Sequence, residues 1–184
     1  MVILINGSFG IGKTTVARLL SKRIKKSVIL DPELIGFVLQ RLSRFIPLRG
    51  RGTDDFQDIS LWRKATFVST FLLHRITRRN IIVPMAYSNL DYVNQLRLGL
   101  IKKGIAIHRF CLVAPIEVVH ERLKKRGTIA TTEEGKWVYP RVSKCCAVHK
   151  DPEFNQQIDT EKLTPQETTD EIVGYLQNAE ASTK

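Results

Sequence analysis

Residues 2–14 read Val2-Ile3-Leu4-Ile5-Asn6-Gly7-Ser8-Phe9-Gly10-Ile11-Gly12-Lys13-Thr14, and they are the part of the chain that best indicates its fold. Val2 to Asn6 is an apolar run of the length of a buried strand, and from Thr14 to Lys25 apolar residues recur at helical spacing. Between them the motif G-x-x-x-x-G-K-[ST] is matched without substitution. A strand before this motif and a helix after it distinguish a phosphate-binding loop from a chance match. We therefore predict that residues 7–14 hold the phosphates of a nucleotide.

Each residue type in this loop suits phosphate binding. The glycines let backbone N–H groups turn inward, and the following helix presents the positive end of its dipole. Lys13 is expected to reach the β- and γ-phosphates, and the Thr14 hydroxyl to bind Mg²⁺. The chain shows no clear N/T-K-x-D motif of the kind that reads guanine, so the predicted cofactors are ATP and Mg²⁺. The predicted nucleotide site comprises Gly7, Ser8, Phe9, Gly10, Ile11, Gly12, Lys13, Thr14, Thr15 and, from a later helix, Arg122.

Beyond residue 25, short apolar runs alternate with longer amphipathic segments, which is typical of βαβ units around a parallel sheet. Strands are predicted at 27–30, 81–83, 105–113 and 157–159, and helices at 60–79, from a cap at Ser88 to near Gly104, from Pro115 to Gly127, and from the capping box at Thr164 onward. Asp31-Pro32-Glu33 predicts a further helix start. Residues 128–153 predict only a short helix after Pro140. We expect one α/β domain over residues 1–184, with a substrate loop near 46–60 and a lid-like segment near 127–153.

Composition narrows the class of protein. The chain has a formal net charge of +11, and no apolar run approaches the roughly 20 residues that span a bilayer. No leader sequence precedes the first strand and the cysteines are odd in number, so we expect a cytoplasmic protein with reduced thiols. The positive charge suits a polyanionic nucleotide. Nucleic acid is not the expected partner, since no recognition motif is present, while contact with an anionic membrane surface and the oligomeric state stay open.

Two acidic residues follow the second predicted strand. Phosphoryl transfer needs an acid near the metal or the nucleophile, and in an open parallel sheet such groups follow the carboxyl ends of strands. We expect Asp31 to lie beside the first strand and to act on an acceptor hydroxyl or help hold Mg²⁺. The alternative role for Asp31 is that of an ordinary helix N-cap. Glu33 could share in binding the metal or simply interact favourably with the helix dipole. The third strand ends Ile82-Val83-Pro84-Met85, without a second acidic metal ligand.

Arginines gather after the fourth predicted strand. Arg122 and Arg126 are four residues apart on one predicted helix, and Arg141 lies in the lid-like segment. The predicted catalytic residues are Lys13, Asp31, Arg126 and Arg141. The two arginines are included because each could neutralise negative charge on the transferred phosphoryl group. The alternative for each is a solvated surface arginine.

Five segments together resemble the tunicamycin-resistance ATP-binding proteins, a family of P-loop kinases. They are residues 5–14, Asp31-Pro32-Glu33 with Gly36-Phe37, Asp54-Asp55-Phe56-Gln57, Leu61-Trp62-Arg63, and Ile82-Val83-Pro84-Met85. The resemblance covers most of the chain through residue 126 and weakens after it. It implies an adenylate-kinase-like, three-layer α/β sandwich with a five-stranded parallel sheet. It also implies ATP binding and protection against tunicamycin, a uridine-based nucleoside antibiotic.

The matching segments also imply an acceptor site, made of Asp31, Glu33, Phe37, Arg49, Asp54, Asp55, Gln57, Trp62 and Arg63. Their polar groups could hold uracil and sugar hydroxyls, while Trp62 or Phe56 stacks or packs on the ligand. Alternatives remain: Trp62 as a core anchor, Asp54 or Asp55 as a helix cap, and Phe37 as a core residue.

The leading hypothesis is an ATP-dependent phosphotransferase that modifies tunicamycin or another nucleoside-like acceptor. The alternatives are an ATP-binding protein that sequesters the antibiotic unmodified, and a housekeeping nucleoside or metabolite kinase.

Overall fold

A computed structural model of the protein describes residues 1–32 and 58–181. Its centre is a sheet of five parallel strands in the order β2-β3-β1-β4-β5. The strands are β1 (Val2–Gly7), β2 (Ser27–Ile29), β3 (Asn80–Met85), β4 (Ile107–Val113) and β5 (Gln156–Asp159). The helices are α1 (Lys13–Arg23), α3 (Ser60–Thr77), α4 (Leu90–Ile101), α5 (Ile116–Lys125), α6 (Glu133–Val148) and α7 (Pro165–Ala181), with a 3₁₀ turn, η2, at Pro152–Phe154. The predicted α/β class and parallel sheet are confirmed.

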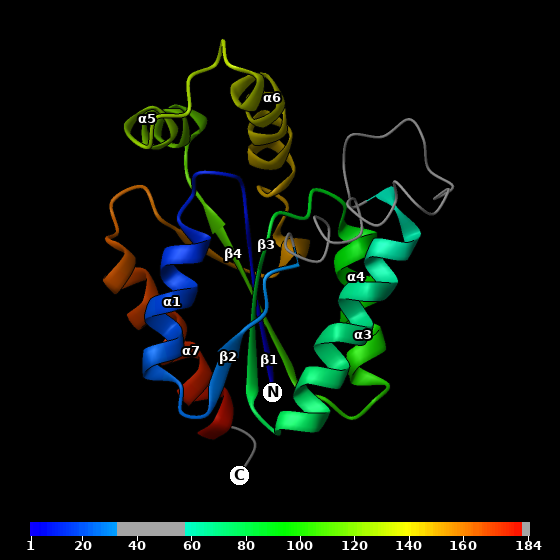
Figure 1. Ribbon diagram of the computed structural model, residues 1–184. Helices are drawn as coiled ribbons and strands as arrows, with labels where there is room; N and C mark the ends of the chain where they lie inside the picture. The colour runs from blue at the N-terminus through cyan, green and yellow to red at the C-terminus, as the bar shows by residue number, and fades with distance from the viewer. Residues whose placement is uncertain (33–57, 182–184) are drawn as a thin grey trace.

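Helices cover both faces of the sheet (Figure 1): α1 and α7 lie on one face, and α3 and α4 on the other. Side chains of β1 alternate between the two layers. Ile3 and Ile5 pack into the core under α1 and α7, and Val2 and Leu4 into the core under α3 and α4. A strand buried on both faces must be apolar throughout, which explains the continuous run at the start of the chain.

The helices α5 and α6 stand beyond the carboxyl ends of the strands, above the turn from β1 to α1 (Figure 1). They form the connection between β4 and β5. Among residues 1–32 and 58–181, no helix is long and apolar enough to cross a membrane.

The position of β2 differs from the prediction. β2 pairs with β3, which separates it from β1, so Asp31 does not follow a neighbour of β1. The physical reason is burial: β3 is six residues long and almost wholly buried, which suits a central strand, whereas β2 has three half-buried residues and suits an edge.

Two helix starts also differ. α4 is capped by Asn89 rather than Ser88, because the Asn89 Oδ1 atom accepts from the Asp91 N–H at 2.8 Å. The short helix expected after Pro140 is wrong: α6 begins at Glu133 and continues through the proline. Thr132 caps it by accepting from the Gly135 N–H at 3.1 Å. The capping box at α7 is confirmed, since Thr164 and Glu167 bond each other's backbone N–H groups.

Candidate active site

The loop between β1 and α1 has the backbone of an anion cradle. Gly7, Gly10 and Gly12 all have positive φ angles, of 154°, 78° and 109°, which side chains disfavour. Gly12 precedes α1, and no side chain caps this helix end. Among the described residues, no heavy atom lies within 4 Å of a Cβ built on Gly12. The first N–H groups of α1 therefore adjoin open space, and the helix dipole favours negative charge there.

Two of these glycines also permit close packing that the sequence did not predict. A Cβ on Gly10 would lie 2.7 Å from Leu123 Cγ in α5, and one on Gly7 would lie 3.0 Å from the Leu112 carbonyl oxygen in β4. The loop thus packs against two elements that come later in the chain, β4 and α5.

Lys13 lies inside the loop. Only 8 % of its surface is exposed, its ammonium group donates to the Ser8 carbonyl oxygen at 2.8 Å, and its Nζ atom is 5.5 Å from the centre of the Phe9 ring. Thr14 and Thr15 are exposed at the start of α1. The Lys13 ammonium group thus lies buried within the loop, whereas the side chain of Thr14 is exposed at the helix start that follows Gly12.

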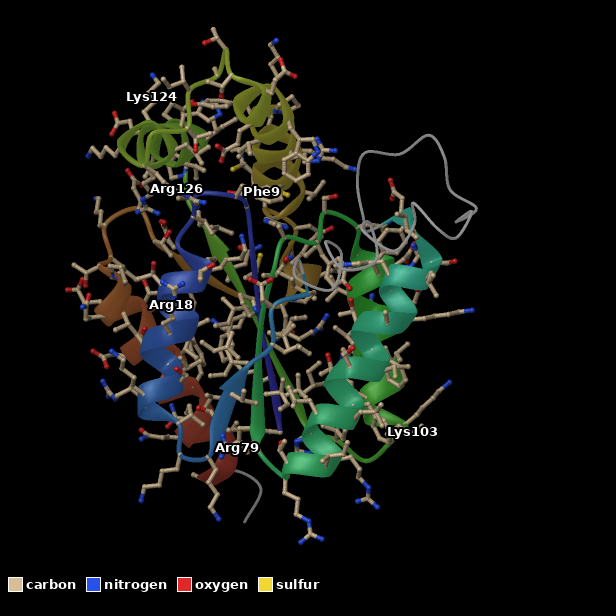
Figure 2. The ribbon with its side chains drawn as sticks, in the orientation of Figure 1. Phe9, Arg18, Arg79, Lys103, Lys124 and Arg126 are labelled. Atoms are coloured by element: carbon tan, nitrogen blue, oxygen red, sulfur yellow. The ribbon has the colours of Figure 1, made fainter. Side chains whose placement is uncertain are left out.

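Aromatic rings connect the loop to α6. Phe9 and Trp137 meet edge to face with their ring centres 5.3 Å apart, and Figure 2 shows Phe9 at the loop beneath α6. The Arg141 guanidinium stacks on Trp137 at 4.0 Å and donates to the Trp137 carbonyl oxygen at 2.9 Å. The Nε atom of Arg141 is buried and has no hydrogen-bond partner. Arg141 thus contacts the Trp137 ring, which in turn contacts Phe9 of the loop, and the Nε–H group of Arg141 can still donate a hydrogen bond.

Arg122 and Arg126 have different surroundings. Arg122 donates to both the carbonyl and hydroxyl oxygens of Thr160, after β5, and lies 3.4 Å from the Ile11 carbonyl oxygen in the loop. It therefore ties the loop to the segment that follows β5. Arg126 is the exposed C-cap of α5 and is drawn below α5, toward α1, in Figure 2, whereas Lys124 is drawn above it.

Asp31 follows β2 and lies one strand further from the loop than expected. With β3 between them, β2 and β1 are two strand spacings apart, or about 10 Å. This separation favours a place on the acceptor side of the loop over direct contact with Thr14. The other predicted acceptor residues Glu33, Phe37, Arg49, Asp54, Asp55 and Gln57 lie outside the described residues, as does most of the predicted substrate loop.

Trp62 and Arg63 begin α3 on the same side. Trp62 is 4 % exposed, packs edge to face on Tyr87 and donates from its indole N–H to the Pro32 carbonyl oxygen at 3.1 Å, so the structure favours the core-anchor alternative. Arg63 lies 4.2 Å above the Tyr92 ring and, with Tyr87 and Tyr92, lines a hollow of about 240 Å³ between α3 and α4.

A buried polar cluster at the end of β1 was missed from the sequence. The Nε2 atom of His149 lies 2.7 Å from the Tyr87 carbonyl oxygen, and Asn6 bonds the Tyr87 backbone through both its Oδ1 and Nδ2 atoms. Burial lowers the pKa of His149 to about 4, so the ring is neutral near pH 7. The cluster joins β1, the end of β3 and the end of α6. The one available signal was Asn6, a polar residue that ends an apolar strand.

A larger cavity of about 490 Å³ borders the loop at Ser8 and Ile11. The ends of β4 and β5 and the C-terminal half of α6 complete its walls. Glu117, Asp159 and Glu161 contribute carboxylates to the lining. Lys150 is the one lysine among the described lining residues, so the carboxylates outnumber it and disfavour phosphate in this cavity.

The resemblance of this chain to known proteins lies in its structure. No family model matches the chain, and no curated protein matches it. The structure of the tunicamycin resistance protein of Deinococcus radiodurans superposes with a TM-score of 0.71 at 27 % sequence identity, over 96 % of this chain and 95 % of that one. A gluconokinase from Sinorhizobium meliloti 1021 gives a TM-score of 0.66 at 18 % identity, over 99 % and 95 % of the two chains. A shikimate kinase from Acinetobacter baumannii, in complex with shikimate, gives 0.59 at 16 % identity, over 97 % and 93 %. The chain therefore has the fold of the P-loop kinases, and its resemblance to a tunicamycin resistance protein is confirmed.

Proposed function

We propose that the protein is an ATP-dependent phosphotransferase whose acceptor is a hydroxyl group of a small nucleoside-type molecule, with tunicamycin as the first candidate. The observation that carries the proposal is the loop itself: an uncapped helix N-terminus adjoins open space over Gly12, and a buried lysine ammonium bonds the backbone of the same loop. The resemblance to the Deinococcus radiodurans protein supports the choice of acceptor.

The residues present fit ATP and Mg²⁺. The backbone N–H groups of residues 10–14 and the ammonium of Lys13 suit the phosphates, and the exposed Thr14 hydroxyl suits the metal. When bound, Mg²⁺ would neutralise charge on the phosphate oxygens. Among the described residues, no group of three or more His, Cys, Asp or Glu side chains could hold a metal alone, so phosphate oxygens and water would supply part of the metal's coordination.

The chain's own residues then divide the work. Asp31 accepts the proton of the acceptor hydroxyl as its oxygen forms a bond to the γ-phosphorus and the bond to the β-phosphate oxygen breaks. Lys13 stabilises the negative charge of the leaving diphosphate. Arg141, held by Trp137, donates to the transferred phosphoryl group.

The helices α5 and α6 cover part of the loop and would exclude water from it once nucleotide fills the open space over Gly12. Leu123 packs over Gly10, and Trp137 packs against Phe9. A dry site strengthens each charge interaction and prevents transfer of the phosphoryl group to water. Movement of α6 would admit the nucleotide, which gives the predicted lid role to residues 127–153.

The test is ADP release by the purified protein with Mg²⁺ and ATP, with and without tunicamycin, followed by mass spectrometry of the drug. We expect tunicamycin to stimulate ADP release and to gain the mass of one phosphoryl group. Lys13→Ala should abolish both, while Lys22→Ala, an exposed lysine at the other end of α1, should change neither. An unmodified drug after prolonged incubation with an ATP-binding protein would exclude the antibiotic as acceptor, and a panel of nucleosides and sugars would then test the metabolite-kinase alternative.

Sequestration of the drug is the second candidate. One observation favours it: β3, which lies beside β1, ends Pro84-Met85 instead of an acidic residue that could hold Mg²⁺. Sequestration predicts one drug molecule bound per protein and no ADP release. Protection that continues well beyond that ratio would contradict it.

A further inference from the structure

A second charged cavity lies at the opposite end of β4 from the nucleotide loop. Its volume is about 300 Å³, and it is lined by Arg97, Ile107, His108, Arg109, Phe110, Asn155, Gln156, Tyr175 and Ala179. Because β5 begins opposite Phe110, residues 107–109 form an edge of the sheet that no described strand pairs on that side. The cavity occupies this edge, with α4 on one face of the sheet and α7 on the other (Figure 1).

Two arginines converge on this cavity, and neither has an acidic partner among the side chains that the structure describes. Arg109 donates to the Asn94 Oδ1 atom at 3.4 Å and to the Asn155 Oδ1 atom at 3.3 Å, which are long bonds to neutral amides. Neither of the two ion pairs among the described residues includes Arg97 or Arg109. The described side chains that line the cavity include no carboxylate.

This arrangement is unfavourable unless an anion joins it. Arg109 projects from a strand, is half-buried and stands close enough to Arg97 that burial and the neighbouring charge both lower its pKa. A solvated helix arginine would avoid both costs by turning into water. Two planar guanidinium groups match the oxygens of a phosphate in paired hydrogen bonds. The Gln156 amide and the Tyr175 hydroxyl, which bond each other at 2.6 Å, add neutral donors to the wall.

We propose that this cavity binds a phosphate group through Arg97 and Arg109, separately from the nucleotide loop. Its volume, roughly ten times that of one water molecule, admits a phosphate attached to a small organic body as well as the free ion. The cavity opens at the amino end of β4, whereas the nucleotide loop follows the carboxyl end of β1, so both sites can be filled at once. The proposal does not depend on the reaction catalysed at the loop.

The test measures thermal unfolding against inorganic phosphate at constant ionic strength, with chloride as the reference anion. Because the nucleotide loop also binds phosphate, the measurements are made on Lys13→Ala protein. We expect phosphate to raise the melting temperature by binding the native state. Adding Arg97→Gln or Arg109→Gln should weaken phosphate binding by about tenfold or more, since each removes charged hydrogen bonds. Adding Lys102→Gln, an exposed lysine just after α4, should leave it unchanged.

A second readout separates binding from a structural role. Without phosphate, Arg97→Gln should not lower the melting temperature, because it relieves repulsion with Arg109. Glycerol 3-phosphate, titrated in the same way, identifies the source: tighter binding than inorganic phosphate indicates an ester ligand, and weaker binding the free ion. Equal phosphate effects in all variants, or none in the Lys13→Ala protein, would overturn the proposal.

Discussion

Asp31 shows how position decides the role of a single side chain. It follows an edge strand, with β3 between it and the strand that leads into the loop. We propose that its carboxylate is the base that receives the acceptor's proton, rather than a ligand of Mg²⁺ beside Thr14.

Replacing Asp31 by Asn tests this role. The substitution keeps the size and the helix-capping ability of the side chain but removes its basicity. We expect turnover to fall by about a hundredfold or more, while ATP affinity and melting temperature stay unchanged. Single-turnover kinetics with the accepted substrate provide the measurement. Turnover close to that of the unmodified protein would leave Asp31 the role of a helix cap alone.

His149 makes a pH-dependent contribution to stability. Its pKa falls from 6.5 to about 4 on folding, because burial disfavours the charged ring. The unfolded chain therefore binds the proton more readily, so this contribution is complete above pH 6.5 and is lost as the pH falls toward 4. The loss amounts to about 3 kcal/mol, at 1.36 kcal/mol per pKa unit.

The comparison is between the unmodified protein and His149→Gln. Denaturant unfolding from pH 7 to pH 4 should show a steeper loss of stability in the unmodified protein. His74→Gln, which alters a half-buried histidine on α3 outside the cluster, is the control variant. Parallel curves for the unmodified and His149→Gln proteins would show that the ring is not buried as described.

At the scale of elements, α6 carries a proline in its interior. Pro140 is exposed, so it fills no cavity, yet it removes one backbone N–H from the helix. We expect Pro140→Ala to raise the free energy of unfolding by roughly 1–3 kcal/mol, close to the cost of an interior proline. Urea titration measures it, with Ser143→Ala on an exposed position of the same helix as the control. A gain in stability accompanied by slower turnover would show that Pro140 in α6 serves the movement of the lid-like segment.

The elements also show what the sequence could and could not predict. The strand, loop and first helix were predicted because every signal lies within 25 consecutive residues. The place of β2 was not, because strand pairing is a long-range property decided by relative burial. The start of α6 was wrong because only a short helix after Pro140 was predicted. An interior proline disfavours a helix, but two local signals outweigh it: the Thr132 cap with Glu133 and Glu134 behind it, and the buried stripe of Val138, Val142 and Cys145.

The same limit applies within the site. The spacing of Arg122 and Arg126 predicts a shared helix face, but Arg122 finds its partner in Thr160, far along the chain. The sequence left two roles for Trp62, a residue that stacks on the ligand and an anchor in the core. Its packing against Tyr87 favours the core anchor. The Asn6, Tyr87 and His149 cluster joins three elements and leaves almost no local trace.

For the whole molecule, the excess of positive charge is spread over both ends. Lys124 is drawn above α5 and Arg126 below it, toward α1, whereas Arg79 and Lys103 lie at the opposite end of the molecule (Figure 2). With a net charge of +11, self-repulsion opposes folding. We expect the melting temperature to rise by a few degrees between low and moderate NaCl, at about 2–4 °C per kcal/mol for a chain of this size. KCl should act equally, since screening is not ion-specific, and a flat response would show that the cations are locally compensated.

The order of the strands also has a consequence for synthesis of the chain. The outer edge of β4 is covered only when β5 arrives, after the whole of α5 and α6. At a translation rate of roughly 5–20 residues per second, that edge waits for seconds before its neighbour is made. During this interval the nascent chain presents an unpaired parallel strand to any other chain nearby. Truncated chains that end before Gln156 would make this state permanent, and they should be recovered as aggregates rather than as smaller domains.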